Sequence, residues 1–247
     1  MQTTLMKTIQ FIFVAVSMIA SFLFYQRFQP EIFMAPEEKV IGAEEIHADP
    51  SGNYSGKTAG EGIVHLNGIN ELEQLNSSDY VTVTTKEIIA TDVYGRKPWV
   101  DPYRLTGMRM SSGRTVSTGR RAKEATKGPA VRAEAYQEYY LIRLPDFRYC
   151  LAQLSPAYAH RLKKGEEMTL PIGQKKATSN EARKYLEDLG KAYGADTSYL
   201  LYMVDDEWAE ENHFRLFLIR IGVSAGVFFF LAVGSLLLLR KVFPEKD

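Results

Sequence analysis

Residues 216–239 read LFLIRIGVSAGVFFFLAVGSLLLL, and this stretch decides what kind of protein the chain forms. The nineteen residues from Ile221 to Leu239 include no charged side chain. At a rise of about 1.5 Å per residue, a helix of that length covers roughly 28 Å, close to the hydrocarbon thickness of a bilayer. Because a helix in a soluble domain seldom needs apolar side chains on every face, residues 216–239 are predicted to span a membrane.

A second apolar stretch, TIQFIFVAVSMIASFLFY at residues 8–25, follows Lys7 near the N-terminus. The run is long for a secretory signal, and Phe33 occupies a position where cleavage before Pro36 would need a small residue. We therefore expect an uncleaved signal anchor, that is, a second transmembrane helix. A cleaved signal peptide is the alternative.

The charges around the two stretches predict an orientation. Basic side chains lie outside the stretches, at Lys7, Arg240, Lys241 and Lys246. Acidic side chains predominate on the inner flanks, most densely at residues 205–211. Three arginines on these flanks, Arg27, Arg215 and Arg220, oppose the trend. Because cytoplasmic segments are enriched in Lys and Arg, we expect both termini in the cytoplasm and the central domain outside it, in a multi-pass protein of the cell membrane.

Between the two stretches the composition changes twice. Residues 26–61 are rich in Pro, Gly and acids and predict a tether. Residues 62–204 carry the patterns of a folded domain, interrupted at 98–132 by a basic, Gly- and Ser-rich loop that we expect to be mobile. Residues 205–215 predict a juxtamembrane helix that leads into the second span, and residues 240–247 a cytoplasmic tail.

Short strands and helices alternate in the domain and predict an α+β fold with a small mixed or antiparallel sheet. Residues 139–144 and 147–153 flank Pro145-Asp146 and predict a β-hairpin, with Phe147, Tyr149 and Leu151 facing the core. Helices are expected at 156–165 and at 178–192, the second after a capping box from Thr178 to Glu181. Further strands are expected at 62–66, 80–93, 168–172 and 199–204.

Seven basic residues of the 98–132 loop form a candidate contact surface. They lie among Gly, Ser and Thr, and are Arg109, Arg114, Arg120, Arg121, Lys123, Lys127 and Arg132. Such a cluster attracts anionic lipid, a cell-wall polyanion or an acidic partner. The alternative is a solvated loop whose charges balance the acidic tether. Nucleic acid is not expected, because no pattern of stacking aromatics accompanies the charges.

Small residues within the two apolar stretches form a candidate helix–helix contact. Gly222 and Gly226 make a GxxxG pattern, and Ser17 and Ser21 give the first stretch a comparable face. The contact would join the two spans, a membrane-protein partner, or a second copy of the chain. The alternative is that small residues are common in membrane helices.

No motif indicates a catalytic, cofactor-binding or metal-binding site, so no site of these three kinds is predicted. Cys150 is the only cysteine, and the four histidines are not at ligand spacing. The acids at 205–211 are explained by the N-terminus of a helix, and they lack the spacing of a calcium loop.

The hairpin EYYLIRLPDFRYCLAQL, followed by SPAYAHRL, resembles small bacterial two-pass membrane proteins that hold an α+β domain between their helices. The resemblance implies that architecture and carries no functional residues. The sequence therefore predicts a two-pass protein whose domain acts by binding or scaffolding close to the bilayer. The alternatives are a membrane-anchored hydrolase or transferase with a site assembled from distant residues, and a subunit of a transport complex.

Overall fold

The computed structural model describes residues 2–34, 63–76, 79–97, 100, 108–109, 115–116, 122–128, 133, 135–170, 172–203 and 212–242. The chain forms two compact units. One unit contains the first and last helices of the chain, and the other contains the α+β domain. Of the predicted tether, residues 26–34 are described and are mostly helical rather than a linker, whereas residues 35–61, like the acidic residues 205–211, lie outside the described residues.

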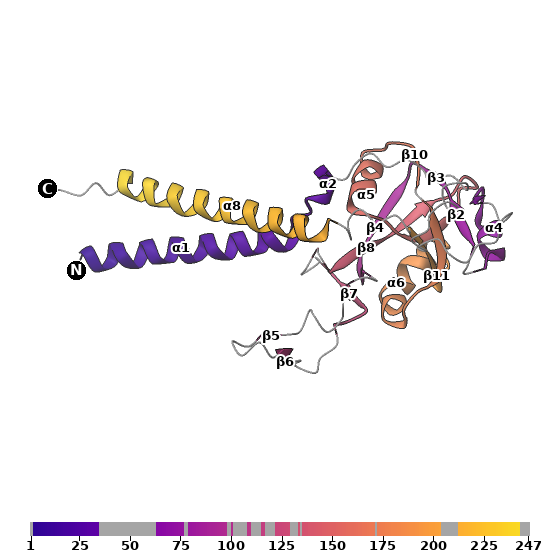
Figure 1. The fold of residues 1–247 in the computed structure, drawn as a ribbon, viewed down its shortest axis with the longest axis horizontal. Coiled ribbons are helices and arrows are strands. Elements are labelled where there is room, and N and C mark those ends of the chain that lie inside the picture. The colour runs from indigo at the N-terminus through magenta and orange to yellow at the C-terminus, as the bar shows by residue number, and fades with distance from the viewer. Residues whose placement is uncertain are drawn as a thin grey trace. The chain divides into compact units, whose positions relative to one another are not determined.

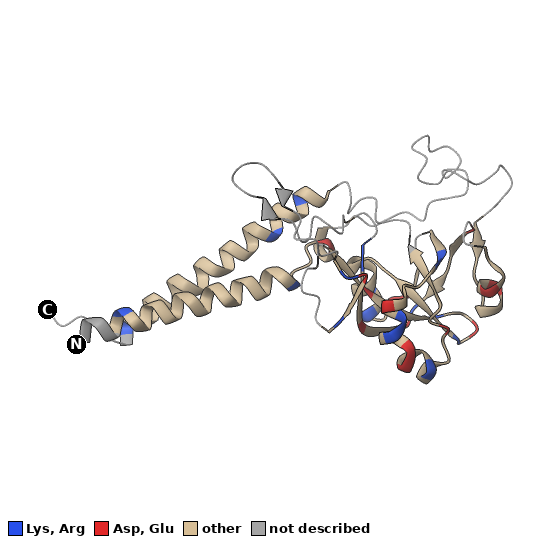
Figure 2. Ribbon diagram, turned by 90° about the horizontal axis from the view of Figure 1, so that it is seen from below, with Lys and Arg blue, Asp and Glu red and all other residues tan. Residues whose placement is uncertain are grey.

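Helices α1 (Gln2–Arg27) and α8 (His213–Val242) pack against one another as an antiparallel pair (Figure 1). Both are long and apolar enough to cross a membrane, over Met6–Arg27 and His213–Leu239. Their charged residues lie toward the helix ends (Figure 2). The sequence prediction of two long apolar helices is confirmed, with ends a few residues beyond those expected.

The domain is built on an eight-stranded mixed sheet, which confirms the predicted α+β class. Its strands, in spatial order, are β1 (Val64–His65), β2 (Tyr80–Thr82), β11 (Gly173–Ala177), β12 (Tyr199–Met203), β9 (Tyr149–Gln153), β8 (Tyr136–Arg143), β4 (Ile88–Arg96) and β7 (Ala125–Lys127). The pairs β1–β2 and β12–β9 are parallel and the others antiparallel. Two further pairs join β3 (Thr84–Thr85) to β10 (Met168–Thr169) and β5 (Met108–Arg109) to β6 (Thr115–Val116).

Side chains of a strand alternate between the two faces of a sheet, and a buried apolar cluster lies on each face of this one. On one face, Ile142 and Ala152 pack with α4 (Ile69–Gln74) and α5 (Pro156–Lys163). On the other, Leu141 and Leu151 pack with α6 (Asn180–Tyr193). The short helix α2 (Glu31–Met34) is joined to the end of β4 by a buried ion pair between Glu31 and Lys97, at 4.0 Å.

The predicted hairpin is confirmed, but Phe147 does not face the core. Strands β8 and β9 pair with Leu141 opposite Leu151, and Leu151 is fully buried. Phe147 is instead 72% exposed and has φ of 67°. Its amide donates to the Leu144 carbonyl, which places it at the left-handed position of a three-residue hairpin loop. The alternation of the strand therefore begins only after the turn.

Helix α6 does not begin with the predicted capping box. Its N-cap is Ser179 rather than Thr178, and the Ser179 hydroxyl accepts from the amide of Ala182. The reciprocal position is therefore Ala182, which has no side-chain acceptor. The Glu181 carboxylate instead accepts from the backbone amides of Glu124 and Ala125, at 3.0 and 3.2 Å. It ties α6 to β7.

The loop expected at 98–132 contains three short strands, β5, β6 and, near its end, β7. Residues Ala125–Lys127 form β7, which pairs with β4, and Ala125 is fully buried. The sequence around Ala125 has too few apolar residues to show this. Most of the remainder of the loop lies outside the described residues, as does the predicted helix start at Asp205.

Candidate functional site

A pocket of about 210 Å³ lies on the face of the sheet that α6 covers, next to Ser179, the N-cap of that helix. Its polar lining consists of Arg96, Glu124, Tyr139, Gln153, Lys176, Ser179 and Tyr202. Ala177 and Leu200 complete the wall. All nine residues belong to the α+β domain.

Strand register brings distant side chains together in this pocket. Gln153 on β9 is the register partner of both Tyr139 on β8 and Tyr202 on β12. Lys176 on β11 lies opposite Leu200, two residues before Tyr202 on the same face. Four neighbouring strands thus present one row of polar side chains beyond the apolar surface that α6 covers.

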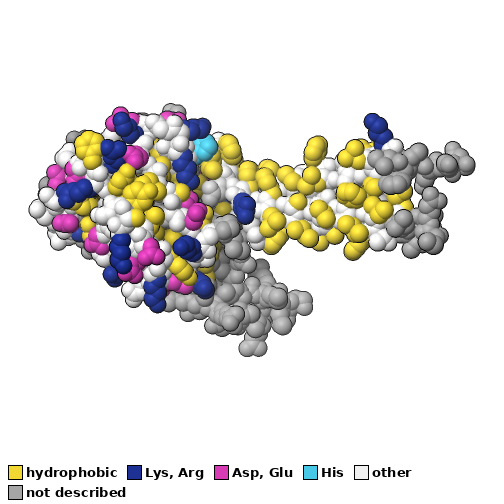
Figure 3. Space-filling view, turned by 180° about the vertical axis from the view of Figure 1, so that it is seen from behind, with side chains coloured by type: hydrophobic (Ala, Val, Ile, Leu, Met, Phe, Trp, Pro, Cys, Tyr) yellow, Lys and Arg dark blue, Asp and Glu magenta, His cyan; other side chains and the backbone are white. Residues whose placement is uncertain are grey.

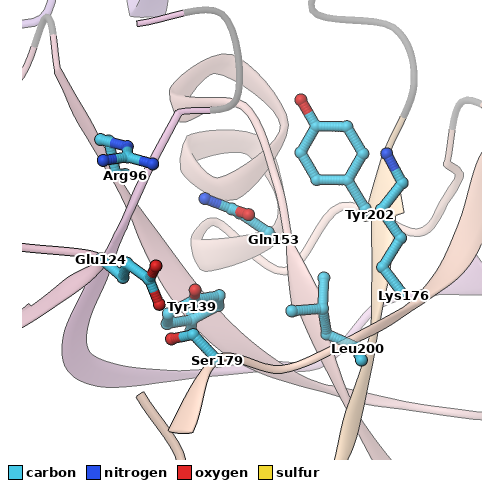
Figure 4. Close-up of a pocket in the computed structure, with 9 residues that line it drawn as sticks. Arg96, Glu124, Tyr139, Gln153, Lys176, Ser179, Leu200 and Tyr202 are labelled. Atoms are coloured by element: carbon cyan, nitrogen blue, oxygen red, sulfur yellow. The ribbon is translucent and has the colours of Figure 1, made fainter. Parts of the chain in front are cut away.

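Gln153 occupies the centre of the pocket, with Arg96 on one side and Lys176 on the other (Figure 4). The side chain is 4% exposed. Its Nε2 is buried without a hydrogen-bond partner in the part of the chain that the structure describes. Leaving such a group unsatisfied costs about 1–3 kcal/mol.

Lys176 supplies a partly desolvated positive charge. Burial lowers the pKa of its ammonium group from the ordinary value of 10.5. The ammonium group lies over the ring of Tyr202, 4.3 Å from the centroid. Among the described residues, no carboxylate lies within 4 Å of it. The charge is therefore stabilised by an aromatic face rather than by an ion pair.

Tyr139 contributes a neutral hydroxyl. Burial, followed by the nearby Glu124 carboxylate, raises the pKa of Tyr139 to about 12. The ring lies against β4 at Gly95, where an added Cβ would lie 2.2 Å from the Tyr139 hydroxyl oxygen. Glycine at position 95 is therefore required for the tyrosine to adopt this position. At neutral pH the hydroxyl remains protonated and can donate.

A second polar cluster is internally satisfied. The Glu87 carboxylate accepts from the Tyr149 hydroxyl at 2.5 Å and pairs with the Arg143 guanidinium group. The hydrogen bond from Tyr149, and then that from Arg143, lower the pKa of Glu87. Each of these three side chains therefore has a partner within the cluster, which joins Glu87 to strands β8 and β9.

The predicted basic contact residues are not gathered into one site by the described part of the chain. Lys123 and Lys127 are exposed. Arg109 lies on β5, and nothing further is described of its side chain. The other four, Arg114, Arg120, Arg121 and Arg132, lie outside the described residues.

The predicted helix-contact residues fall into two groups. Ser17 and Ser21 are buried, 5% and 9% exposed, and the Ser21 hydroxyl donates to the Ser224 carbonyl of α8 at 2.6 Å. Gly222 and Gly226 are exposed, and a Cβ on either would meet nothing within 4 Å. The serines therefore lie at the contact between α1 and α8, whereas the glycines face away from it.

The thiol of Cys150 lies in the core of the domain. Cys150 is 1% exposed, and burial raises the pKa of its thiol. Within the described ranges, no group of three or more His, Cys, Asp or Glu is placed to hold a metal ion.

Sequence reasoning missed the pocket. The one available signal was Gln153, a polar residue that ends the otherwise apolar strand YCLAQ. Lys176 gave no signal, because GQKKA does not resemble a strand. Comparison of the chain with known protein families, with curated proteins and with solved structures returns no match. The likeness to small bacterial two-pass membrane proteins therefore stays a prediction.

Proposed function

We propose that this chain is a two-pass integral membrane protein whose α+β domain lies outside the cytoplasm and acts by binding. One observation carries the membrane assignment: along the pair formed by α1 and α8, many large apolar side chains are exposed, whereas Ser17, Ser21, Arg220 and Ser224 are buried. Phe11 and Phe230 are 74% and 79% exposed. Ser21 and Ser224 are buried against each other.

This distribution is the reverse of that in a water-soluble helix pair. Figure 3 shows apolar side chains along the outer surface of the two helices. A contiguous apolar surface of this kind is rare in soluble monomers. In a bilayer, helix association depends on close packing and on hydrogen bonds between helices, which is the role that Ser21 takes.

The charges support the proposed orientation. Lys7, Arg240 and Lys241 lie outside the apolar segments, and the inner flank at 205–211 is acidic. Under the positive-inside rule, the two termini lie in the cytoplasm. The binding role is supported by the pocket around Gln153.

Single-cysteine labelling tests the proposal in cells. In a Cys150→Ala background, Lys191→Cys marks the exposed face of α6 and Lys246→Cys marks the C-terminal tail. A membrane-impermeant maleimide should label the Lys191→Cys variant in intact cells, and the Lys246→Cys variant only after permeabilisation. The reverse pattern would overturn the orientation, and extraction of the chain by alkaline carbonate would overturn membrane integration.

The outward glycines point to a second helix contact. Because Gly222 and Gly226 do not contact α1, the proposed contact is with a membrane-protein partner or with a second copy of the chain. A Gly222→Ile, Gly226→Ile variant should lose that association in detergent while the α1–α8 pair persists. Unchanged association would contradict the contact.

A further inference from the structure

We propose that the pocket around Gln153 binds a small molecule through an oxyanion, a carboxylate or a phosphate, held by Gln153, Lys176 and Arg96. The inference deepens the binding role proposed above and rests on it. It does not depend on which side of the membrane the domain occupies.

The buried amide of Gln153 carries the argument. Nearly all buried polar groups in native proteins are hydrogen-bonded, so each exception requires an explanation. The Nε2 of Gln153 is buried at the centre of a pocket and lacks a partner among the described residues. A ligand acceptor at this position would satisfy the amide.

The remaining lining determines the chemistry of the acceptor. Arg96 and Lys176 contribute two positive charges, and Glu124 contributes one negative charge. The Tyr139 hydroxyl is a neutral donor at physiological pH. Ser179 places the pocket at the N-terminus of the fourteen-residue helix α6, whose dipole favours negative charge. Because donors and positive charge predominate, an oxyanion, which only accepts, is the complementary group.

The size of the pocket limits the ligand. The volume of the pocket is about 210 Å³. It lies below the roughly 300–1,000 Å³ that is usual for drug-sized ligands. One anionic group with a short organic portion against Leu200 fits these limits. The anion could belong to a free metabolite or to a lipid headgroup.

Titration of the full chain in non-ionic detergent tests the inference. Inorganic phosphate and acetate are the probes, and chloride at equal ionic strength and glycerol are the controls. Binding is followed by calorimetry and by the amide proton signals of Gln153. At least one oxyanion should bind saturably and shift those signals, whereas chloride and glycerol should not. If neither oxyanion binds above the chloride background, the inference is overturned.

Two charge variants give opposite expected outcomes. Lys176→Gln removes a positive charge and should weaken oxyanion binding about tenfold or more, the effect of losing one charge-assisted bond. Glu124→Gln removes the opposing charge and should strengthen binding. If the affinity for the oxyanion changed in the same direction in both variants, the site would not be electrostatic.

A pair of glutamine variants separates binding from stability. Gln153→Leu should raise thermal stability and abolish oxyanion binding, because it removes both the unsatisfied amide and the ligand's donor. Gln137 is the matched control, since its Oε1 is also buried without a partner within the described chain, but it does not line the pocket. Gln137→Leu should leave binding unchanged. Retained binding in the Gln153→Leu variant would overturn the inference.

Vesicles separate the two sources of the anion. If the anion is a lipid headgroup, vesicles containing phosphatidylglycerol should shift the amide proton signals of Gln153 without added phosphate. Vesicles of phosphatidylcholine should not. If the anion is a free molecule, both vesicles should require added phosphate. A negative phosphate titration would not change the result of the cysteine-labelling test of membrane orientation. A negative labelling test would likewise leave the phosphate titration unchanged.

Discussion

Phe147 has a left-handed backbone conformation, with φ of 67°, that L-amino acids adopt at a cost of about 1–2 kcal/mol. The guanidinium group of Arg143 lies over its ring, 4.5 Å from the centroid. Comparing alanine with glycine at this position isolates the backbone cost, because neither variant retains the ring.

We expect the Phe147→Gly variant to be more stable than the Phe147→Ala variant by about 1 kcal/mol, measured by chemical denaturation in detergent. At a position with negative φ the order would be reversed, since glycine loses more entropy on folding. A more stable alanine variant would therefore contradict the left-handed turn.

Glu87 predicts a dependence of stability on pH. Its folded pKa lies below the ordinary value of 4.5, because of the hydrogen bond from Tyr149 and then that from Arg143. Its contribution to stability is therefore fully present above about pH 4.5 and is lost as the pH falls through the folded pKa. The Glu87→Gln variant should be less stable than the unmodified chain at pH 7, by less than about 1 kcal/mol because the pair is partly exposed.

That difference in unfolding free energy should shrink toward pH 2. Tyr149→Phe keeps the carboxylate and removes one donor, so it should show the same trend with a smaller amplitude. A difference that does not change with pH would mean that the Glu87 carboxylate contributes nothing through its charge.

At the scale of elements, polar contacts join α1 to α8. Besides the Ser21 bond, the Nε of Arg220 donates to the carbonyl of Phe28 at 2.8 Å, just past the C-terminal end of α1. Arg220 is 1% exposed. A cation at that end complements the helix dipole and a carbonyl that no further helical turn can satisfy.

We expect Arg220→Met to weaken the pair by about 1–3 kcal/mol, because it leaves the Phe28 carbonyl unsatisfied. Ser21→Ala should cost less, about 0.6 kcal/mol, the average for a hydrogen bond between membrane helices. Unfolding in a titration with sodium dodecyl sulfate would measure both. Ser235→Ala is the control, since that hydroxyl donates to the Ala232 carbonyl of its own helix. A control as unstable as Arg220→Met would contradict the assignment.

At the scale of the whole molecule, Cys150 reports opening of the domain core. The thiol is 1% exposed within the cluster that contains Ile142 and Leu144. Burial raises its pKa, and the thiolate is the reactive form. We expect a thiol reagent to modify the folded chain at least about 1,000-fold more slowly than the chain in denaturant, since the core must first open.

The Lys191→Cys variant in the Cys150→Ala background is the matched control and should react at once, because residue 191 is exposed. Rapid reaction of Cys150 in native buffer would show that the core around β9 opens freely. The same burial makes Cys150 unsuitable as a marker of membrane topology.

The elements predicted from sequence were those whose signal is local. The two apolar helices follow from the length of their runs, and the β8–β9 hairpin follows from Pro145-Asp146 between alternating strands. The second half of α6 follows from Leu186 at helical spacing. Each of these depends on residues within about one helix or one turn of each other.

Tertiary structure alone decided the pocket. Tyr139, Gln153, Lys176 and Tyr202 become neighbours only because β8, β9, β12 and β11 pair in one particular register. Strand β11 and strand β7 have little apolar signal of their own and are ordered by the strands beside them. The sequence by itself determined which segments avoid water. It could not determine the pairing of strands far apart in the chain, because register depends on cross-strand contacts that no single segment contains.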